Sequence, residues 1–343
     1  MKKRITYSSI VLIISLISFS YVFYDPTPIY LEIPKNWPKP AYNFSKNPLT
    51  EEGFQLGRHL FYDPILSRDN TISCASCHLQ QTGFTHVDHD LSHGIEGKIG
   101  TRNSATLMNL AWSTHFMWDG GINHLEVQPL APIESEVEMD ETLENIVKKL
   151  QNSKKYQLLF EKAFGTKKIT GQLTLKALAQ FVVMLKTDNS KYDKVIRKEV
   201  NFTAQEQKGY TLFKQNCASC HTEPLFTNNS FENNGLEIDT TLNDFGRRKI
   251  TNNSKDKLKF KVPTLRNIQF TFPYMHDGRF STLTEVVKHY NTGIHQSETL
   301  SLKLVKPMNL SDNERVDLVT FLKTLTDEEF LFNPRFSFPR ANN

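Results

Sequence analysis

The sequence predicts a mainly α-helical protein that is built from two copies of one unit. A chain of 343 residues is long enough for about two domains. The pentapeptide Cys-Ala-Ser-Cys-His occurs twice, at 74–78 and at 217–221, and segments with helical periodicity flank both copies. Hydrophobic residues make up 38% of the chain, which argues against a multi-span membrane protein. The net charge of +4 comes without a dense basic stripe, so we expect no nucleic-acid partner.

The first 48 residues predict export and an extended arm. In residues 1–24, three basic residues precede an apolar stretch, as in a secretory signal peptide. The uncharged run that follows is also just long enough to span a bilayer, so a retained N-terminal anchor stays open. Either alternative places the remaining chain outside the cytoplasm and predicts a periplasmic protein. Residues 25–48 are rich in proline and aromatic residues and predict an extended arm.

The cysteines predict two covalently attached haems. All four cysteines lie in the two pentapeptides, at Cys74, Cys77, Cys217 and Cys220. Cys-x-x-Cys-His is the attachment motif of c-type haem, in which the two thiols bind the porphyrin and the histidine binds iron. His78 and His221 are therefore the predicted proximal ligands. A zinc site, a thioredoxin-like motif or two disulfides would not explain a duplicated pentapeptide that ends in histidine.

The first unit, 49–195, is the predicted N-terminal domain. It opens with a segment that ends in Gly-Arg-His-Leu-Phe at 57–61, ahead of the first haem motif. It closes with an amphipathic helix over 175–185. The boundary is expected in the polar segment 188–201.

The second unit, 196–343, repeats this order. Thr203 and Glu206 form a capping box ahead of Gly-Tyr-Thr-Leu-Phe and the second haem motif. Ser311 and Glu314 form another at the start of the closing helix. Helix, haem motif, long loop and closing helix is the order of a small cytochrome c domain, so we expect two cytochrome c-like domains. In the long loop of the second unit, the lysines at 255, 257, 259 and 261 are expected to form a solvated face.

Beyond the haem motifs, the sequence from about residue 45 to 330 resembles the bacterial di-haem cytochrome c peroxidases and their MauG-like relatives. The resemblance depends on the order of several motifs, which are GRxLFxDxxLS at 57–67, GTRNS at 100–104, FxWDG at 116–120, PI at 132–133, VEM at 137–139, VPTLRN at 262–267 and PYMHDG at 273–278. It implies an enzyme that reduces hydrogen peroxide to water with electrons from a small protein such as a c-type cytochrome. It also implies a peroxidatic haem at His78 and an electron-transfer haem at His221.

The resemblance assigns catalytic roles to three residues of the first unit. Glu138 falls on the family's catalytic carboxylate, which moves a proton between the peroxide oxygens. Gln128 falls on a position that lines the same pocket, as does Pro132. Trp118 falls on the tryptophan between the two haems. From the residues alone, Glu138 could instead lie on a solvated helix start over 134–144, and Trp118 could be a core residue.

The distal ligand of the first haem stays open between alternatives. Many relatives carry a displaceable histidine in the loop before Gly-x-Arg-Asn, and counting back along this loop leads to Glu96, with His93 three residues earlier. Either His93 is the displaceable ligand or the site is open at rest. His86 and His89 are further candidates, and each of these residues could also be an ordinary loop histidine.

For the second haem, the family's methionine position falls on Tyr290, as in the MauG-like branch. Met275 and Met308 are the alternative sixth ligands, and Tyr290 could also be an amphipathic tyrosine at a helix end. The family's calcium ion would bind the Asn103 side chain and the carbonyl groups of Thr271 and Pro273.

Two other functions remain as alternatives. One is a MauG-like di-haem oxidase that oxidises residues of a partner protein, and the other is a non-enzymatic di-haem electron carrier. The sequence leaves a homodimer open.

Overall fold

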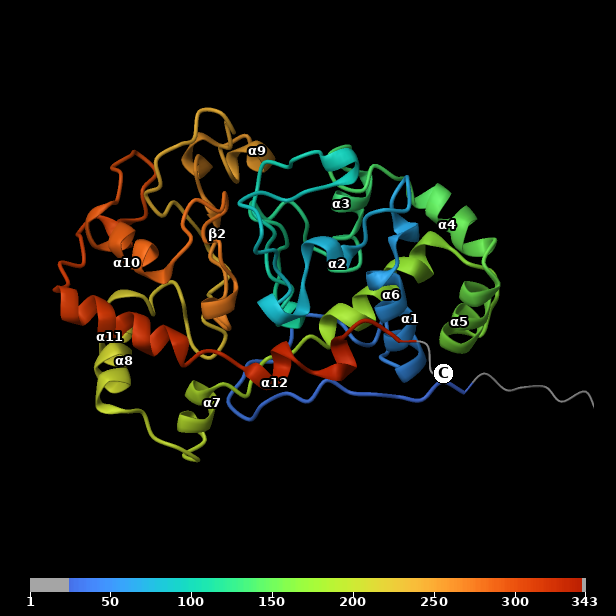
Figure 1. The fold of residues 1–343 in the computed structure, drawn as a ribbon, viewed down its shortest axis with the longest axis horizontal. Helices are drawn as coiled ribbons and strands as arrows, with labels where there is room; N and C mark the ends of the chain where they lie inside the picture. Colours follow the sequence, from blue (N-terminus) through green and yellow to red (C-terminus); the bar gives the residue numbers. More distant parts are fainter. Residues whose placement is uncertain (1–24, 341–343) are drawn as a thin grey trace, which may run out of the picture.

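The computed structural model describes residues 25–340 and confirms a mainly α-helical fold (Figure 1). The predicted signal peptide or anchor, 1–24, lies outside the described residues. Among the helices within 25–340, none has the length and apolar character that a bilayer crossing needs. Two hydrophobic clusters form the cores of two domains that lie side by side.

The first domain is built around helices α1 (Glu51–Tyr62) and α6 (Gly171–Val183), which pack against each other. Thr50 caps α1 by accepting a hydrogen bond from the backbone of Gly53, and Thr170 caps α6. Gly57 lets the helices approach closely, because a Cβ there would lie 1.9 Å from the Ala177 carbonyl oxygen. Helices α4 (Leu143–Gln151) and α5 (Lys154–Phe164) complete this domain.

The second domain repeats this packing with α8 (Ala204–Asn216) and α11 (Asp312–Lys323). Both predicted capping boxes, at Thr203 and at Ser311, are confirmed. Gly209 takes the place of Gly57, since a Cβ there would lie 2.0 Å from the Asp317 carbonyl oxygen. Helix α10 (Leu283–Thr292) packs against α11.

The remaining elements are short. Besides several 3₁₀ turns, they are α2 (Cys74–Cys77), α3 (Leu130–Glu134), α7 (Lys191–Ile196), α9 (Arg248–Thr251), α12 (Glu328–Leu331) and the antiparallel strands β1 (Phe231–Glu232) and β2 (Phe260–Lys261).

The repeat extends into the loops through which each domain contacts the other. Met117 and Met275 both have a positive φ, of 68° and 80°, in turns that continue to a glycine with a φ of about 70°. Trp118 and His276 follow these methionines and therefore hold equivalent places. The carbonyl oxygen of Trp118 accepts a hydrogen bond from the second domain, and that of His276 accepts one from the first.

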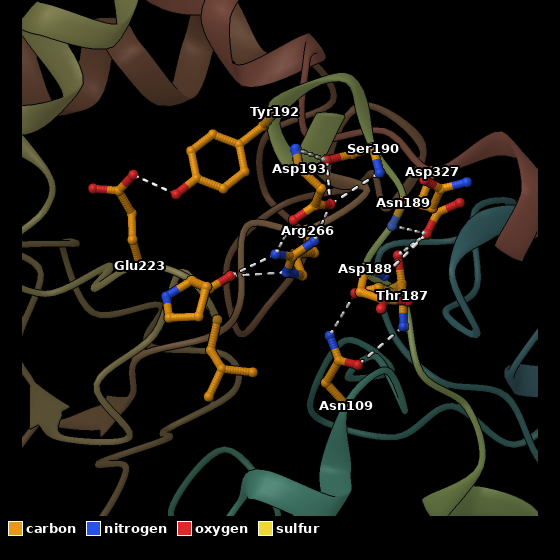
Figure 2. Close-up of polar contacts among 12 residues, drawn as sticks. Asn109, Thr187, Asp188, Asn189, Ser190, Tyr192, Asp193, Glu223, Arg266 and Asp327 are labelled. Atoms are coloured by element: carbon orange, nitrogen blue, oxygen red, sulfur yellow. Dashed lines mark hydrogen bonds and ion pairs between the residues drawn. The ribbon is translucent and has the colours of Figure 1, made fainter. Parts of the chain in front are cut away.

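The connector between the domains is tightly bonded, although its polar sequence predicted a boundary (Figure 2). The Asp327 carboxylate accepts hydrogen bonds from the Thr187 hydroxyl and from the backbones of Asp188 and Asn189, at 2.9–3.1 Å. Next to it, the fully buried Arg266 forms a two-point ion pair with Asp193, with both distances at 2.8 Å. The connector is thereby fixed at both of these points.

Both ends of the described chain pack against the first domain. The arm 25–48 runs along its underside toward α7 in Figure 1, and the Pro38 carbonyl accepts a hydrogen bond from the Trp112 indole at 2.8 Å. The sequence grouped the C-terminal segment with 196–343, but Phe330, Leu331 and Phe336 pack into the core of the first domain.

Candidate active site

A cavity of about 440 Å³ lies beside the first haem motif, and both domains line it. Cys74, Cys77 and His78 form part of one wall. Its apolar lining includes Phe61, Ile72, Leu107, Leu178 and Val182 from the first domain and Leu225 from the second. The cavity therefore offers a mostly apolar space next to paired thiols and an imidazole.

His78 is held in the orientation that a metal ligand needs. It follows helix α2, and its Nδ1 lies 2.8 Å from the Phe84 carbonyl oxygen. This bond fixes the ring and leaves Nε2 free for a metal. Burial lowers the pKa of His78 to about 4, so the imidazole is neutral at physiological pH, as coordination requires.

Glu138 also lines this cavity. Helix α3 ends at Glu134 and α4 begins at Leu143, so Glu138 lies in the turn between them and not on a solvated helix start. Ser92 donates a hydrogen bond to its carboxylate at 3.3 Å. Burial raises the pKa of Glu138 above its ordinary value, against the opposing effect of hydrogen bonds from Ser92 and Ser135. A half-buried carboxyl group with a raised pKa is suited to receiving and returning a proton.

The loop 92–100 brings one of the three candidate histidines to the cavity. His93 lines the cavity, and the His93 carbonyl oxygen accepts a hydrogen bond from the Cys77 thiol at 3.2 Å. His86 and His89 belong to the same ring cluster but lie outside the cavity lining. Glu96, the position reached by counting along the loop, is exposed and forms an ion pair with Arg68.

Trp118 and Gln128 line the same cavity. The Trp118 indole donates to the Asn103 carbonyl oxygen at 2.9 Å, and its own carbonyl oxygen accepts from the backbone N–H of Lys261 at 2.7 Å. Gln128 contacts the Met117 sulfur through its amide nitrogen at 3.6 Å. Trp118 thus stands at the seam of the two domains.

The second haem motif has the same arrangement as the first. His221 Nδ1 lies 3.1 Å from the carbonyl oxygens of both Phe226 and Pro263, and burial lowers its pKa to about 4. Pro263 also lines the first cavity. The segment 261–263 therefore connects the second motif's histidine, through Pro263, with Trp118, through Lys261.

Tyr290, on α10, is one of the candidate sixth ligands and lies near the second motif. The thiols of Cys217 and Cys220 are close enough to affect its ionisation, and burial raises the pKa of Tyr290 to about 12. The side chain of Asn234 hydrogen-bonds with Tyr290, and its amide also reaches the Met275 sulfur at 3.4 Å. Met308 packs against the core of the second domain.

The residues proposed for calcium lie near the seam. The Asn103 side chain donates to the Asp90 carbonyl oxygen at 3.0 Å, and its backbone N–H donates to the His276 carbonyl oxygen at 2.7 Å. Thr271 packs within van der Waals distance of the position that a Cβ on Gly83 would take.

Sequence reasoning missed two basic residues of the seam, Arg102 and Lys261. Arg102, from the first domain, lines the cavity and forms ion pairs with Asp119 and with Asp244 of the second domain, each at 2.6 Å. Lys261 lines the cavity too, so its expected place on a solvated lysine face is wrong, whereas Lys255 is exposed as expected. An alignment of the two units with each other would have pointed to Lys261, because it is the counterpart of Asn103.

Comparison with known proteins identifies the family. The sequence model of "Di-haem cytochrome c peroxidase" matches residues 51–201, and that of "Cytochrome c" matches 206–326. The chain is 37% identical to the methylamine utilization protein MauG of Methylorubrum extorquens, over 82% of this chain and 80% of that protein. It belongs to the di-haem cytochrome c peroxidase family.

Two further members of this family are similar over most of their length. The cytochrome c551 peroxidase of Nitrosomonas europaea is 34% identical, with 83% of this chain and 82% of that protein covered. The crystal structure of a MauG-like protein associated with microbial copper homeostasis superposes with a TM-score of 0.81 at 32% identity, covering 91% of this chain and 99% of that one.

The residues present fit the two c-type haems that a di-haem family implies. Each motif supplies two thiols that form no disulfide. Each motif also supplies a neutral histidine whose Nδ1 is bonded to a carbonyl group, which leaves Nε2 for iron.

Proposed function

We propose that this di-haem cytochrome c peroxidase reduces hydrogen peroxide to two water molecules, taking up two electrons and two protons. The observation that carries the proposal is the place of Glu138, whose pKa is raised by burial, in the cavity beside His78. Relatives named as cytochrome c peroxidases, at 34% and 36% identity, support the same activity.

In this proposal the haems are held by the cysteines and histidines of the two motifs. Bound haem supplies the redox chemistry that cleaves the O–O bond of peroxide. His78 would hold the first iron from its proximal side, and His221 would hold the second. His93 would be a displaceable ligand of the first iron, because it lines the same cavity as His78.

Glu138 would move the proton. Its carboxylate would take a proton from the peroxide oxygen nearer the iron and deliver it to the leaving oxygen, which departs as water. Ser92 would keep the carboxylate aimed into the cavity through its hydrogen bond. Gln128 would help to orient peroxide in the same cavity.

Electrons would enter at the second unit from a small donor such as a c-type cytochrome and pass along the seam. The segment 261–263 supports this route, since it is hydrogen-bonded to His221 at one end and to the backbone of Trp118 at the other. Trp118 would complete the path, because its indole lies in the wall of the first cavity.

A second candidate function is a MauG-like oxidase of a partner protein. The observation that favours it is Tyr290, because a phenolate ligand would stabilise ferric iron at the second haem, whereas Met275 or Met308 would favour ferrous iron. The 37% identity to a MauG protein also supports it.

We also propose a cellular location, a bound cation and an oligomeric state for this enzyme. The basic and apolar sequence of residues 1–24 supports export to the periplasm. Asn103, Thr271 and Pro273 would supply oxygen ligands to a calcium ion at the seam. The oligomeric state would be a monomer or a homodimer.

The test is an electron count on the purified holoprotein. Reduced c-type cytochrome is mixed with a limiting amount of peroxide, and its oxidation is followed by absorbance. A peroxidase oxidises two cytochrome molecules for each peroxide molecule consumed. No peroxide-dependent oxidation, with both haems present, would contradict the proposal.

A further inference from the structure

Lys261 extends from the second domain into the cavity of the first. It lies in strand β2 opposite Phe231 of β1, which fixes its backbone. Its N–H donates to the Trp118 carbonyl oxygen at 2.7 Å, so the position is fixed from the first domain as well. The side chain is half-buried and forms part of the cavity wall.

The ammonium group of Lys261 has no anionic partner among residues 25–340. Two other lysines of this region are paired, Lys259 with Asp256 and Lys303 with Glu232. The carboxylate of Asp119, which also lines the cavity, is bound by Arg102. Burial lowers the pKa of Lys261 to about 8, which reflects the cost of holding a cation there without a counter-charge.

An anion that occupies the cavity would remove this cost. Hydrogen peroxide is neutral at physiological pH, so the substrate does not supply the charge. A c-type haem does, because it carries two propionate carboxylates on the edge of the ring away from its thioether bonds. Those bonds would be made to the first domain at Cys74 and Cys77, while Lys261 reaches the cavity from the second domain.

We propose that Lys261 binds a propionate of the first haem and acts as a positioning residue between the two domains. The inference builds on the proposed di-haem function and assigns a role that the haem motifs do not contain. Because the same residue bonds to Trp118, the propionate, the indole and the segment 261–263 would be fixed relative to one another. The cation would also stabilise the reduced state of the first haem, since reduction adds negative charge nearby.

The test compares Lys261→Met with Lys261→Arg and with the control Lys255→Met, which removes an exposed lysine of the same loop. The midpoint potential of the first haem is measured by spectroelectrochemical titration of each holoprotein, after a haem count. We expect a lower potential in Lys261→Met, a potential near that of the wild type in Lys261→Arg, and no change in Lys255→Met. An unchanged potential in Lys261→Met overturns the inference.

A structure of the wild-type holoprotein tests the contact without any substitution. We expect Lys261 Nζ within about 3.2 Å of a propionate oxygen of the first haem, as in a charged hydrogen bond. A lysine that points elsewhere overturns the inference even if Lys261→Met fails to acquire haem. The electron count with cytochrome and peroxide does not depend on the contact of Lys261 with a propionate. The peroxidase function is therefore tested separately from this inference.

Discussion

At Glu138, burial and hydrogen bonding act in opposite directions on one carboxyl group. Burial favours the neutral acid, hydrogen bonds from Ser92 and Ser135 favour the carboxylate, and the net result is a raised pKa. Glu136 lies two residues away in the same turn but is exposed. The two residues therefore form a matched pair for testing proton transfer.

We predict that Glu138→Gln lowers the rate of peroxide reduction by about 10²–10⁴-fold, the usual contribution of a positioned acid–base group. Glutamine keeps the shape of the side chain but cannot accept the proton. Steady-state oxidation of reduced cytochrome c by peroxide is the measurement, and Glu136→Gln is expected to retain the wild-type rate. Equal rates for wild type and Glu138→Gln would remove Glu138 from its role.

The pH dependence of the rate of peroxide reduction is a second test of Glu138. Glu138 must be ionised to accept a proton, so activity falls as the pH drops through its pKa. Because that pKa is raised, the wild-type rate should decline at a higher pH than an ordinary glutamate, with its pKa of 4.5, would produce. Glu136→Gln should keep this acid limb.

Tyr290 is the proposed sixth ligand of the second haem, with Met275 and Met308 as the alternatives. We predict that Tyr290→Met raises the midpoint potential of this haem, because a thioether stabilises ferrous iron and a phenolate stabilises ferric iron. Spectroelectrochemistry of the holoprotein measures the change. Met308→Leu should leave the potential as it is, and a shift in that variant with none in Tyr290→Phe would make Met308 the ligand.

At the scale of elements, two helix pairs depend on glycine for the same close approach. In α1–α6 a Cβ on Gly57 would meet the Ala177 carbonyl oxygen, and in α8–α11 a Cβ on Gly209 would meet the Asp317 carbonyl oxygen. Each contact is with backbone, which cannot rotate away as a side chain can. The helices would have to separate to accept a methyl group.

We predict that Gly57→Ala and Gly209→Ala each lower the free energy of unfolding by about 1–3 kcal/mol, the usual cost of overpacking a core. Chemical denaturation of the holoprotein measures the change. Lys208→Ala, on the exposed side of α8, is the control and should have little effect. Stability equal to the wild type in both glycine variants would contradict the close packing.

At the scale of the whole molecule, buried polar groups fix the connector between the domains. Burial alone would raise the pKa of Asp193, but the hydrogen bonds and charge of Arg266 and hydrogen bonds from Ser190 more than offset it, so the pKa lies below its ordinary value. The pair therefore stabilises the fold above the pKa of an unfolded aspartate. This contribution is lost as the pH falls through the lower, folded value.

We predict that Arg266→Met lowers the free energy of unfolding by about 3–5 kcal/mol at neutral pH, since it leaves Asp193 buried without its partner. Denaturant unfolding at pH 7 measures the loss. Asp193→Asn combined with Arg266→Met should recover part of the stability, because no uncompensated charge then remains. A double variant less stable than Arg266→Met alone would contradict this explanation.

Much of what the sequence predicted correctly depends on patterns of residues that are close together in the chain. The mainly helical fold and the family were predicted correctly, since haem motifs, capping boxes and helical periodicity involve residues close together in the chain. The motif around Glu138 also led to a residue that lines the cavity. Its raised pKa could not be predicted, because burial depends on packing between distant segments.

The errors and omissions concern contacts between the two units. Lys261 lies among alternating lysines that indicate a solvated face, yet it lines the cavity that both domains form. Asp327 looks like an ordinary helix cap, yet its carboxylate also accepts hydrogen bonds from the connector between the domains. In both cases the partner is remote in sequence.

The most direct test of the account is electron paramagnetic resonance of the oxidised holoprotein before and after addition of cyanide. The account predicts two ferric haems that differ, with only the haem beside Glu138 accessible to the added ligand. Cyanide should therefore change one signal and leave the other as it was. Two identical signals that cyanide does not alter would contradict the division of tasks between the two haems.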